Sequence, residues 1–405
     1  MIAAERAVQR PRGARLLVVD ADGRITDAKR SRWLDFLQRG DLVIANDAAT
    51  LPASLFGTHV RTGQSIEVRL AAWRGVFDVL SRTAEFDALV FGDGDHRTRT
   101  EDRPPPPALV PGDTLLLGTL VANVEQVLGH PRLVHLRFDA SLARFWRGIA
   151  VSGTPIQYAH LRDPLALWDT WTPIAASPVA FEPPSAGFVV DWQALATMRV
   201  RGIDFATITH AAGLSSTGDE GLDRRLPFDE PYRIPPSTAQ SIARAQRRCA
   251  RIIAVGTTVV RALEHAVRKD GVVRGGSALA TQRIGARTRL QIVDGIVTGT
   301  HEPRSSHYEL LRAFASDDVL QRASDALERQ HFRTHEFGDS MLLFTDREIR
   351  LRGVFPAFPG LRGARRTRAP ATMHSPRPQP HMSSRVRMAP AAARRAPPPG
   401  CRGSR

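Results

Sequence analysis

Short apolar segments alternate with Gly, Pro and polar turns along the chain, and their lengths predict a mixture of strands and helices. Near the N-terminus, residues 15–20 and 42–45 have the pattern of buried strands, with a short helix predicted at 32–38. After Gly153 the two element types alternate. We expect helices at 195–201, 237–249, 258–267, 307–314 and 319–329, and strands at 203–209, 252–255, 290–293, 295–298 and 341–344. This alternation predicts an α/β domain.

The middle of the chain has a different pattern. Apolar segments of similar length recur between Gly- and Pro-rich turns, at 66–70, 76–80, 88–91, 114–120 and 133–138. Regularly spaced short strands are typical of a small all-β barrel or sandwich. Their position inside the chain indicates an inserted domain.

Basic charge is concentrated at the C-terminal end. The chain carries 56 Lys and Arg against 41 Asp and Glu, but 13 of the arginines and none of the acids lie in residues 349–405. The remaining 348 residues are therefore nearly neutral, and bulk charge does not indicate their function. The tail is rich in Arg, Pro and Ala without periodicity, so we expect it to be disordered. It is either an RNA-binding extension or the product of out-of-frame translation.

Composition excludes several classes of protein. Cys249 and Cys401 are the only cysteines, which excludes a disulfide framework and a CxxC zinc site. The two lysines, Lys29 and Lys269, make a Schiff-base lysine or a P-loop improbable. The most apolar stretch, 115–124, is too short and too polar to span a bilayer. We therefore expect a cytoplasmic protein without a membrane partner.

One candidate site lies where the predicted strand 252–255 meets the next helix. Gly256 permits a tight turn, and Thr257 or Thr258 can cap the helix. Free N–H groups at the helix N-terminus suit a carboxylate or phosphate. The alternative is an ordinary strand–turn–helix connection. Arg261 could bind an anionic group, or it could pair with Glu264 on the same helix.

A second candidate site follows the predicted strand 295–298. His301 could act as an acid or base near neutral pH, and Ser305 begins the next helix. The alternative is that Ser305 only caps that helix and His301 is an exposed loop residue. Further polar positions end other strands or lie in loops, and each alone is equally consistent with a turn or cap: Asn46, Asp47, Thr209, Glu230 and Asp339.

Taken in order along residues 2–344, these segments resemble the S-adenosylmethionine:tRNA ribosyltransferase-isomerases of queuosine synthesis. Ile253-Ala-Val-Gly-Thr-Thr-Val-Val-Arg261-Ala-Leu-Glu264 is similar to the family's I-A-V-G-T-T-S-V-R-x-L-E. Three other segments carry the resemblance: Gly40 to Gly57, similar to G-D-L-x-x-x-N-D-T-R-V-I-P-A-R-L-x-G; Val293 to Ser305, similar to V-D-x-x-x-T-N-F-H-L-P-x-S; and Phe337 to Met341, similar to Y-G-D-A-M.

The resemblance implies an α/β main domain built from both chain ends, at 1–60 and 150–346, with a β-barrel inserted at 61–149 and a tail at 347–405. It also implies transfer and isomerisation of the ribosyl part of S-adenosylmethionine onto 7-aminomethyl-7-deazaguanine in the anticodon of tRNA, giving epoxyqueuosine. S-adenosylmethionine is then a co-substrate, and no further cofactor or metal is expected. We expect the protein to act as a monomer.

Site roles follow from the same resemblance. His301 is the first candidate for acid/base chemistry and Glu230 the second. The expected substrate-binding residues are Asn46, Asp47, Ser185, Gly187, Thr209, Gly256, Thr257, Thr258, Arg261, Ser305 and Asp339.

Several polar positions of the family are replaced. Ala49 and Ser54 stand where the family has arginines, Val189 and Phe228 where it has histidines, and Gly299 for an asparagine. His210 lies one place before the histidine of the family's V-T-L-H-V-G. Two other hypotheses therefore stay open: a diverged paralogue that uses another S-adenosylmethionine or nucleoside substrate, and a non-catalytic RNA-binding protein with the same fold.

Overall fold

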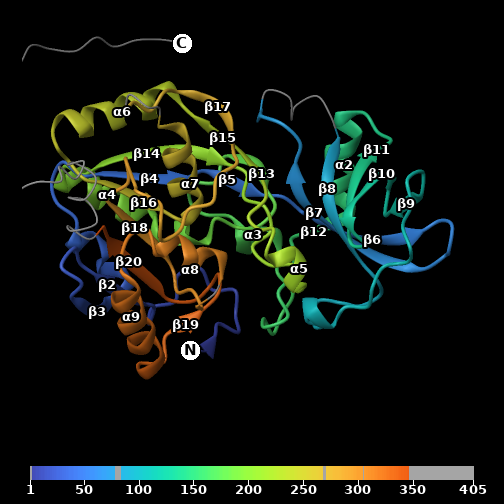
Figure 1. Ribbon diagram of the computed structural model, residues 1–405, viewed down its shortest axis with the longest axis horizontal. Coiled ribbons are helices and arrows are strands. Elements are labelled where there is room, and N and C mark those ends of the chain that lie inside the picture. The colour runs from blue at the N-terminus through green and yellow to red at the C-terminus, as the bar shows by residue number, and fades with distance from the viewer. Residues whose placement is uncertain (1, 78–83, 268–270, 304, 346–405) are drawn as a thin grey trace, which may run out of the picture. The chain divides into compact units, whose positions relative to one another are not determined.

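The computed structural model describes residues 2–77, 84–267, 271–303 and 305–345. A mixed nine-stranded sheet forms its centre (Figure 1). In spatial order its strands are β17 (Gly276–Ala280), β15 (Glu230–Ile234), β14 (Asp204–His210), β4 (Leu42–Asn46), β16 (Ile252–Val255), β18 (Gly295–Gly299), β20 (Ser340–Phe344), β2 (Arg15–Val19) and β3 (Ile25–Lys29). Both ends of the described chain contribute strands, which confirms the predicted α/β domain built from both ends.

The four central strands β14, β4, β16 and β18 run parallel, so their carboxyl ends share one edge of the sheet. Their side chains are buried on both faces. Ile44 and Ile296 pack on one side with α6 (Pro236–Arg247), α7 (Thr257–Ala266), α8 (Ser306–Leu311) and α9 (Asp317–Arg329). Val43 and Val297 pack on the other with η1 (Arg30–Phe36), η3 (Ser185–Val189) and α4 (Trp192–Arg201). Such two-sided burial explains the nearly continuous apolar runs of these strands.

Six antiparallel strands close into the expected barrel, which Figure 1 shows as one group with α2 (Leu142–Ser152). They are β6 (Ser54–His59), β7 (Ser65–Trp73), β8 (Glu85–Phe91), β11 (Leu133–Phe138), β10 (Leu120–His130) and β9 (Thr114–Leu117), with β9 pairing back onto β6. Rings from the strands and from α2 fill one end of the interior; Phe86 stacks on Phe145 with centroids 5.1 Å apart. The barrel strands extend from Ser54 to Phe138, and α2 follows them.

The remaining elements are short. β1 (Ile2–Ala3) pairs with β19 (Arg333–Thr334), and β5 (Ala48–Thr50) pairs with β13 (Ser177–Ala180). β12 (Gly153–Thr154) pairs antiparallel with β6. Single-turn helices are η2 (Thr100–Asp102), α3 (Leu167–Thr170) and α5 (Glu220–Asp223). None of the helices in the described ranges has both the length and the apolar composition needed to cross a bilayer. The expected tail at 347–405 and part of the predicted strand 76–80 lie outside the described residues.

The strand predicted at 290–293 was wrong. The backbone N–H groups of Gln291, Ile292 and Val293 all donate to the carboxylate of Glu264, at 2.8–2.9 Å. A single side chain on α7 thus binds the donors that a neighbouring strand would otherwise use, and the segment forms a bend that leads into β18. The apolar pattern alone cannot reveal such a partner, because Glu264 lies far from this segment in the sequence.

Replacement of Glu264 tests this anchor. We expect Glu264→Ala to lower the free energy of unfolding by about 2–3 kcal/mol, because three backbone donors lose their acceptor. The measurement is urea denaturation followed by circular dichroism. Glu328→Ala, at an exposed position on α9, is the matched control and should cause no measurable loss. If both substitutions lower the free energy of unfolding equally, Glu264 does not anchor the bend at residues 291–293.

Candidate active site at the carboxyl edge of the sheet

The expected site residues from separate parts of the sequence lie along the carboxyl edge of the parallel strands. Thr209 is the last residue but one of β14, Asn46 ends β4, Gly256 follows β16 and His301 follows β18. Because β15 runs antiparallel to β14, Glu230 at its start lies at the same edge. Ligands in open α/β sheets bind outside the carboxyl ends of the strands, so this is the expected place for a site.

Two of these side chains hold neighbouring segments together. The Asn46 amide donates to the backbone oxygen of His210 at 2.9 Å and accepts from its N–H at 2.9 Å, which joins β4 to β14. The Asp47 carboxylate accepts hydrogen bonds from the hydroxyls of Thr207 and Thr209, at 2.9 and 2.7 Å. The hydroxyl of Thr209 is thus already bonded within the protein.

Gly256, rather than a threonine, is the N-cap of α7, so the predicted threonine cap was wrong. Its φ of 97° lies in the region that favours glycine, and no side chain caps the helix. The N–H groups of the first turn therefore stay available to a ligand. A Cβ at Gly256 would lie 3.5 Å from that of Ala186, which brings the segment containing Ser185 and Gly187 next to this turn.

Glu230 and Arg261 form a buried ion pair at the edge. Glu230 also accepts from the N–H of Gly213 at 2.6 Å, and the Arg261 guanidinium donates to the backbone oxygen of Ala280 at 3.0 Å. Burial raises the pKa of Glu230, and the attraction of Arg261 opposes that rise. Arg261 therefore pairs with Glu230 and not with its helix neighbour Glu264, whose acceptors are used elsewhere.

His301 is part of a group of histidines. Its Nε2 shares a 2.7 Å hydrogen bond with the Thr298 hydroxyl, and its ring centroid lies 4.9 Å from that of His307. Burial, with contributions from His307 and His335, holds the pKa of His301 well below its usual range, so the imidazole is neutral near pH 7. It is partly buried and not the exposed loop residue of the alternative interpretation.

Ser305 and Asp339 have local bonding roles. The Ser305 hydroxyl accepts from the N–H of Tyr308 and caps α8, as predicted. The Asp339 carboxylate accepts from the N–H groups of Arg15 and Arg333, at 2.7 and 2.8 Å. It thereby holds the start of β2 and β19 beside the turn that leads into β20.

A cavity of about 450 Å³ adjoins this edge. Its wall comes from the barrel, from the segment after β12, and from the turn between β19 and β20; the ionisable or hydrogen-bonding lining residues include Arg69, Tyr158, His160, Glu182, Ser215, His335 and Glu336. None of the residues expected from the sequence lines it.

Two links connect the cavity with the edge of the sheet. Gly213, which binds Glu230, lies two residues before Ser215, whose N–H donates to Glu182 at 3.0 Å. His335 in the cavity wall also contributes to the shifted pKa of His301. The two regions therefore form one continuous polar zone.

The cavity contains ionisable groups whose pKa values have moved toward their neutral forms. Burial, and then the neighbouring Glu336, raise the pKa of Glu182 to about 8. Burial and the adjacent His335 lower the pKa of His160 to about 4. Near neutral pH the Glu182 carboxyl can donate a proton, and the His160 imidazole can accept a hydrogen bond or bind a ligand.

Sequence reasoning missed this second group. Glu182 immediately precedes the Pro183-Pro184-Ser185 segment, and His335-Glu336 immediately precede Phe337-Gly338. The position of His335 and Glu336 beside Phe337 to Met341, a segment that carries the family resemblance, was the signal that could have indicated them.

Comparison with known proteins gives a consistent result. Residues 1–343 match the profile of a family described as "Queuosine biosynthesis protein". The S-adenosylmethionine:tRNA ribosyltransferase-isomerase of Sorangium cellulosum is 32% identical over 84% of this chain and 94% of its own, and that of Geobacter sulfurreducens is 30% identical over 85% and 96%. Among solved structures, the S-adenosylmethionine tRNA ribosyltransferase of Thermotoga maritima is 23% identical, with a TM-score of 0.44, over 84% of this chain and 96% of that one.

Removal of Arg261 tests the buried ion pair. We expect Arg261→Met to lower the free energy of unfolding by about 3 kcal/mol, because Glu230 then stays buried without its partner. Arg312→Met is the matched control. Arg312 forms ion pairs too, with Glu309 and Asp317, but at the surface, so its replacement should lower the free energy of unfolding much less. Urea denaturation measures both. If Arg312→Met lowers the free energy of unfolding more than Arg261→Met does, burial of the ion pair does not explain the effect.

His210 gives a pH-dependent prediction. It is fully buried, and neither ring nitrogen has a hydrogen bond in the described structure, although Nε2 lies 3.5 Å from the Glu230 carboxylate; burial and then Arg261 hold its pKa well below its usual 6.5. The unfolded chain therefore takes up a proton below pH 6.5 that the folded chain does not. This costs about 1.4 kcal/mol of stability per pH unit for that proton.

His210→Phe should consequently show a smaller fall in Tm between pH 7 and pH 5 than the unaltered protein. The lowered pKa values of His160, His301 and His307 keep part of the dependence in both proteins. His331→Asn, at an exposed position, is the control and should not change the slope. If the Tm of His210→Phe falls as much between pH 7 and pH 5 as that of the unaltered protein, His210 does not contribute to the pH dependence of stability.

Proposed function

The chain belongs to the family of queuosine biosynthesis proteins, the S-adenosylmethionine:tRNA ribosyltransferase-isomerases, and on this basis we propose its reaction. It transfers and isomerises the ribosyl part of S-adenosylmethionine onto 7-aminomethyl-7-deazaguanine in the anticodon region of a tRNA. The product is epoxyqueuosine, and adenine and methionine are released. The observation that carries the proposal is the family match over residues 1–343, which spans both the sheet and the barrel.

The reaction requires a base, an acid and an anion site. A base removes a proton from the carbon beside the sulfonium, which the adjacent positive charge makes acidic. The departing adenine is helped by a proton or hydrogen bond. The methionine carboxylate needs N–H donors, and the uncapped first turn of α7 at Thr257 and Thr258 supplies a suitable group of them.

We assign the base to His301 and the acid to Glu182. His301 is supported by its place after β18, which pairs with the strand that leads into Gly256, and its imidazole is unprotonated near pH 7. Glu182 is supported by a carboxyl group that is still largely protonated near pH 7. Glu230 was the second acid/base candidate. Its bonds to Arg261 and Gly213 favour a positioning role, in which it holds the loop that carries Ser215.

The strand ends and segments around Gly256 supply the other residues of the proposed substrate site. Asn46, Asp47, Ser185, Gly187 and Thr209 are proposed to shape the substrate site, since they border the turn at Gly256 or lie on the neighbouring strand ends. S-adenosylmethionine is the co-substrate, and this chemistry requires no further cofactor. We propose that the protein acts on its tRNA substrate as a monomer in the cytoplasm.

The reaction is tested with purified protein, S-adenosylmethionine and a tRNA bearing the deazaguanine precursor. We expect release of adenine, measured by liquid chromatography, and no release with a tRNA that carries guanine instead. Glu182→Gln and His301→Gln should each slow release by about 10²–10⁴-fold. Glu101→Gln, at an exposed position on the same cavity wall, is the control and should retain the rate.

Two outcomes would overturn the proposal. No adenine release above background from folded protein excludes this reaction, and tRNA binding without turnover would favour a non-catalytic role. Full activity of Glu182→Gln would remove Glu182 from the mechanism and leave the family reaction intact.

A further inference from the structure

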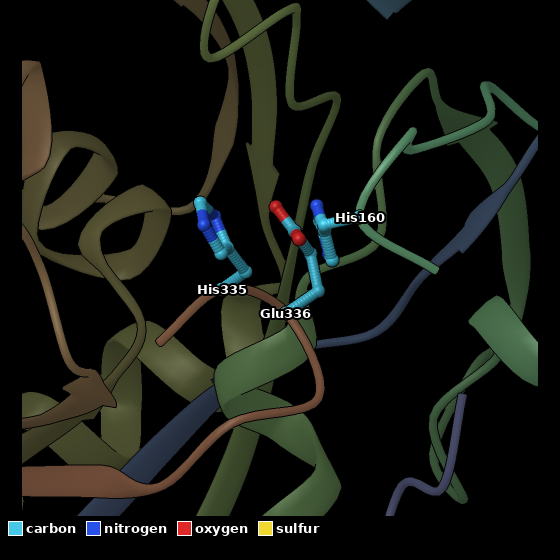
Figure 2. A group of neighbouring side chains, drawn as sticks. All are labelled: His160, His335 and Glu336. Atoms are coloured by element: carbon cyan, nitrogen blue, oxygen red, sulfur yellow. The ribbon is translucent and has the colours of Figure 1, made fainter. Parts of the chain in front are cut away.

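Three metal-ligating side chains meet on the wall of the cavity. Figure 2 shows His160, His335 and Glu336 side by side. One ligand atom from each residue can be chosen so that all three lie within 4.8 Å of one another. His160 comes from the segment between β12 and α3, and the other two come from the turn between β19 and β20.

The local structure brings these side chains close together. The N–H of Gly338 donates to the backbone oxygen of His335 at 2.9 Å and closes a tight turn. His335 has a φ of 69°, an unfavourable conformation for a non-glycine residue, and such strain is concentrated at functional sites and ligand clamps. The ring of His335 stacks on that of His160 with centroids 4.4 Å apart, and His160 in turn stacks on Tyr158 at 5.5 Å.

Buried polar atoms in this cluster lack partners within the described structure. His160 Nε2, Glu336 Oε2 and the Tyr158 hydroxyl are buried without a hydrogen bond. Buried polar groups are normally satisfied, so each of these atoms requires an explanation. Glu182 and Glu336 also place two carboxyl groups in one cavity, while the nearby Arg69 guanidinium binds Glu67 through two hydrogen bonds. A cation bound by these side chains would give the buried atoms of His160 and Glu336 a partner.

We propose that His160, His335 and Glu336 form a binding site for a divalent transition-metal ion, with Zn²⁺ as the reference ion. Two imidazole nitrogens and one carboxylate oxygen are a ligand set of zinc and non-haem iron sites, whereas Mg²⁺ and Ca²⁺ prefer oxygen alone. In a tetrahedral zinc site the ligand atoms lie about 3.4 Å apart, given bonds of about 2.0–2.1 Å. Starting from a 4.8 Å triangle, each atom needs to move by about 0.8 Å, and one imidazole has to rotate out of the ring stack so that both nitrogen lone pairs point at the ion.

Such an ion would keep open coordination positions, since only three protein ligands are present in the cluster and it borders a cavity. A site of that kind binds water or a substrate heteroatom in the open position. The inference does not depend on the proposed reaction, because it rests on the ligand geometry alone and is tested by binding.

The test is isothermal titration of the full, chelator-treated chain with Zn²⁺. We expect one tight site per chain, weakened at least 100-fold in His335→Ala and in Glu336→Gln. Glu336→Gln preserves the side-chain shape, so a folding defect is avoided, and melting curves check both variants. His331→Ala and Glu101→Gln are matched controls, with the same residue types at exposed positions outside the cluster, and should bind as the unaltered protein does.

A Co²⁺-substituted sample provides a second readout: its visible spectrum should lack thiolate charge-transfer bands, which separates this site from one at the exposed Cys249. Three outcomes would overturn the proposal. They are no Zn²⁺ binding at millimolar concentration, unchanged binding in the His335→Ala and Glu336→Gln variants, or loss of binding in Cys249→Ala.

Discussion

The buried pair of Glu230 and Arg261 is the interaction on which the site depends. Arg261 lies on α7, and its guanidinium binds Glu230 at the start of β15 and the backbone oxygens of Phe228 and Ala280. Glu230 in turn binds the loop at Gly213. One buried charge pair therefore joins the central helix, two outer strands and the loop that reaches the cavity. A pair of this kind adds little to stability over an apolar replacement, but the loss of one partner is costly.

The placement of the sheet edge could be predicted from local signals. An apolar run that ends in Gly256, followed by a helical pattern, indicates a strand–turn–helix unit, and parallel strands bring their carboxyl ends to one edge. The partner of Arg261 could not be predicted in this way. Glu264 is its neighbour on the helix, whereas Glu230 reaches it only because β15 pairs antiparallel with β14. Register between distant strands is a tertiary property that a local pattern does not contain.

The cavity illustrates the same limit more strongly. Tyr158, Glu182 and Glu336 come from segments far apart in the chain, and no local pattern in the sequence predicts that they share one cavity. Their importance arises from burial, which raises the pKa of Glu182 and leaves the Tyr158 hydroxyl without a partner in the described structure. Burial of this kind follows from how the barrel and the sheet enclose a shared space, and neither composition nor spacing expresses it.

The position of β20 has a consequence for synthesis of the protein. This last strand lies between β18 and β2, and within the sheet β2 pairs only with β20 and β3. The β2–β3 hairpin, which is made before the barrel strands, therefore cannot join the sheet until the residues up to Phe344 have been made. The barrel pairs its strands only among nearer segments and can close much earlier. Folding is thus expected to begin in the middle of the chain and to finish by bringing its two ends together, a slow, long-range step.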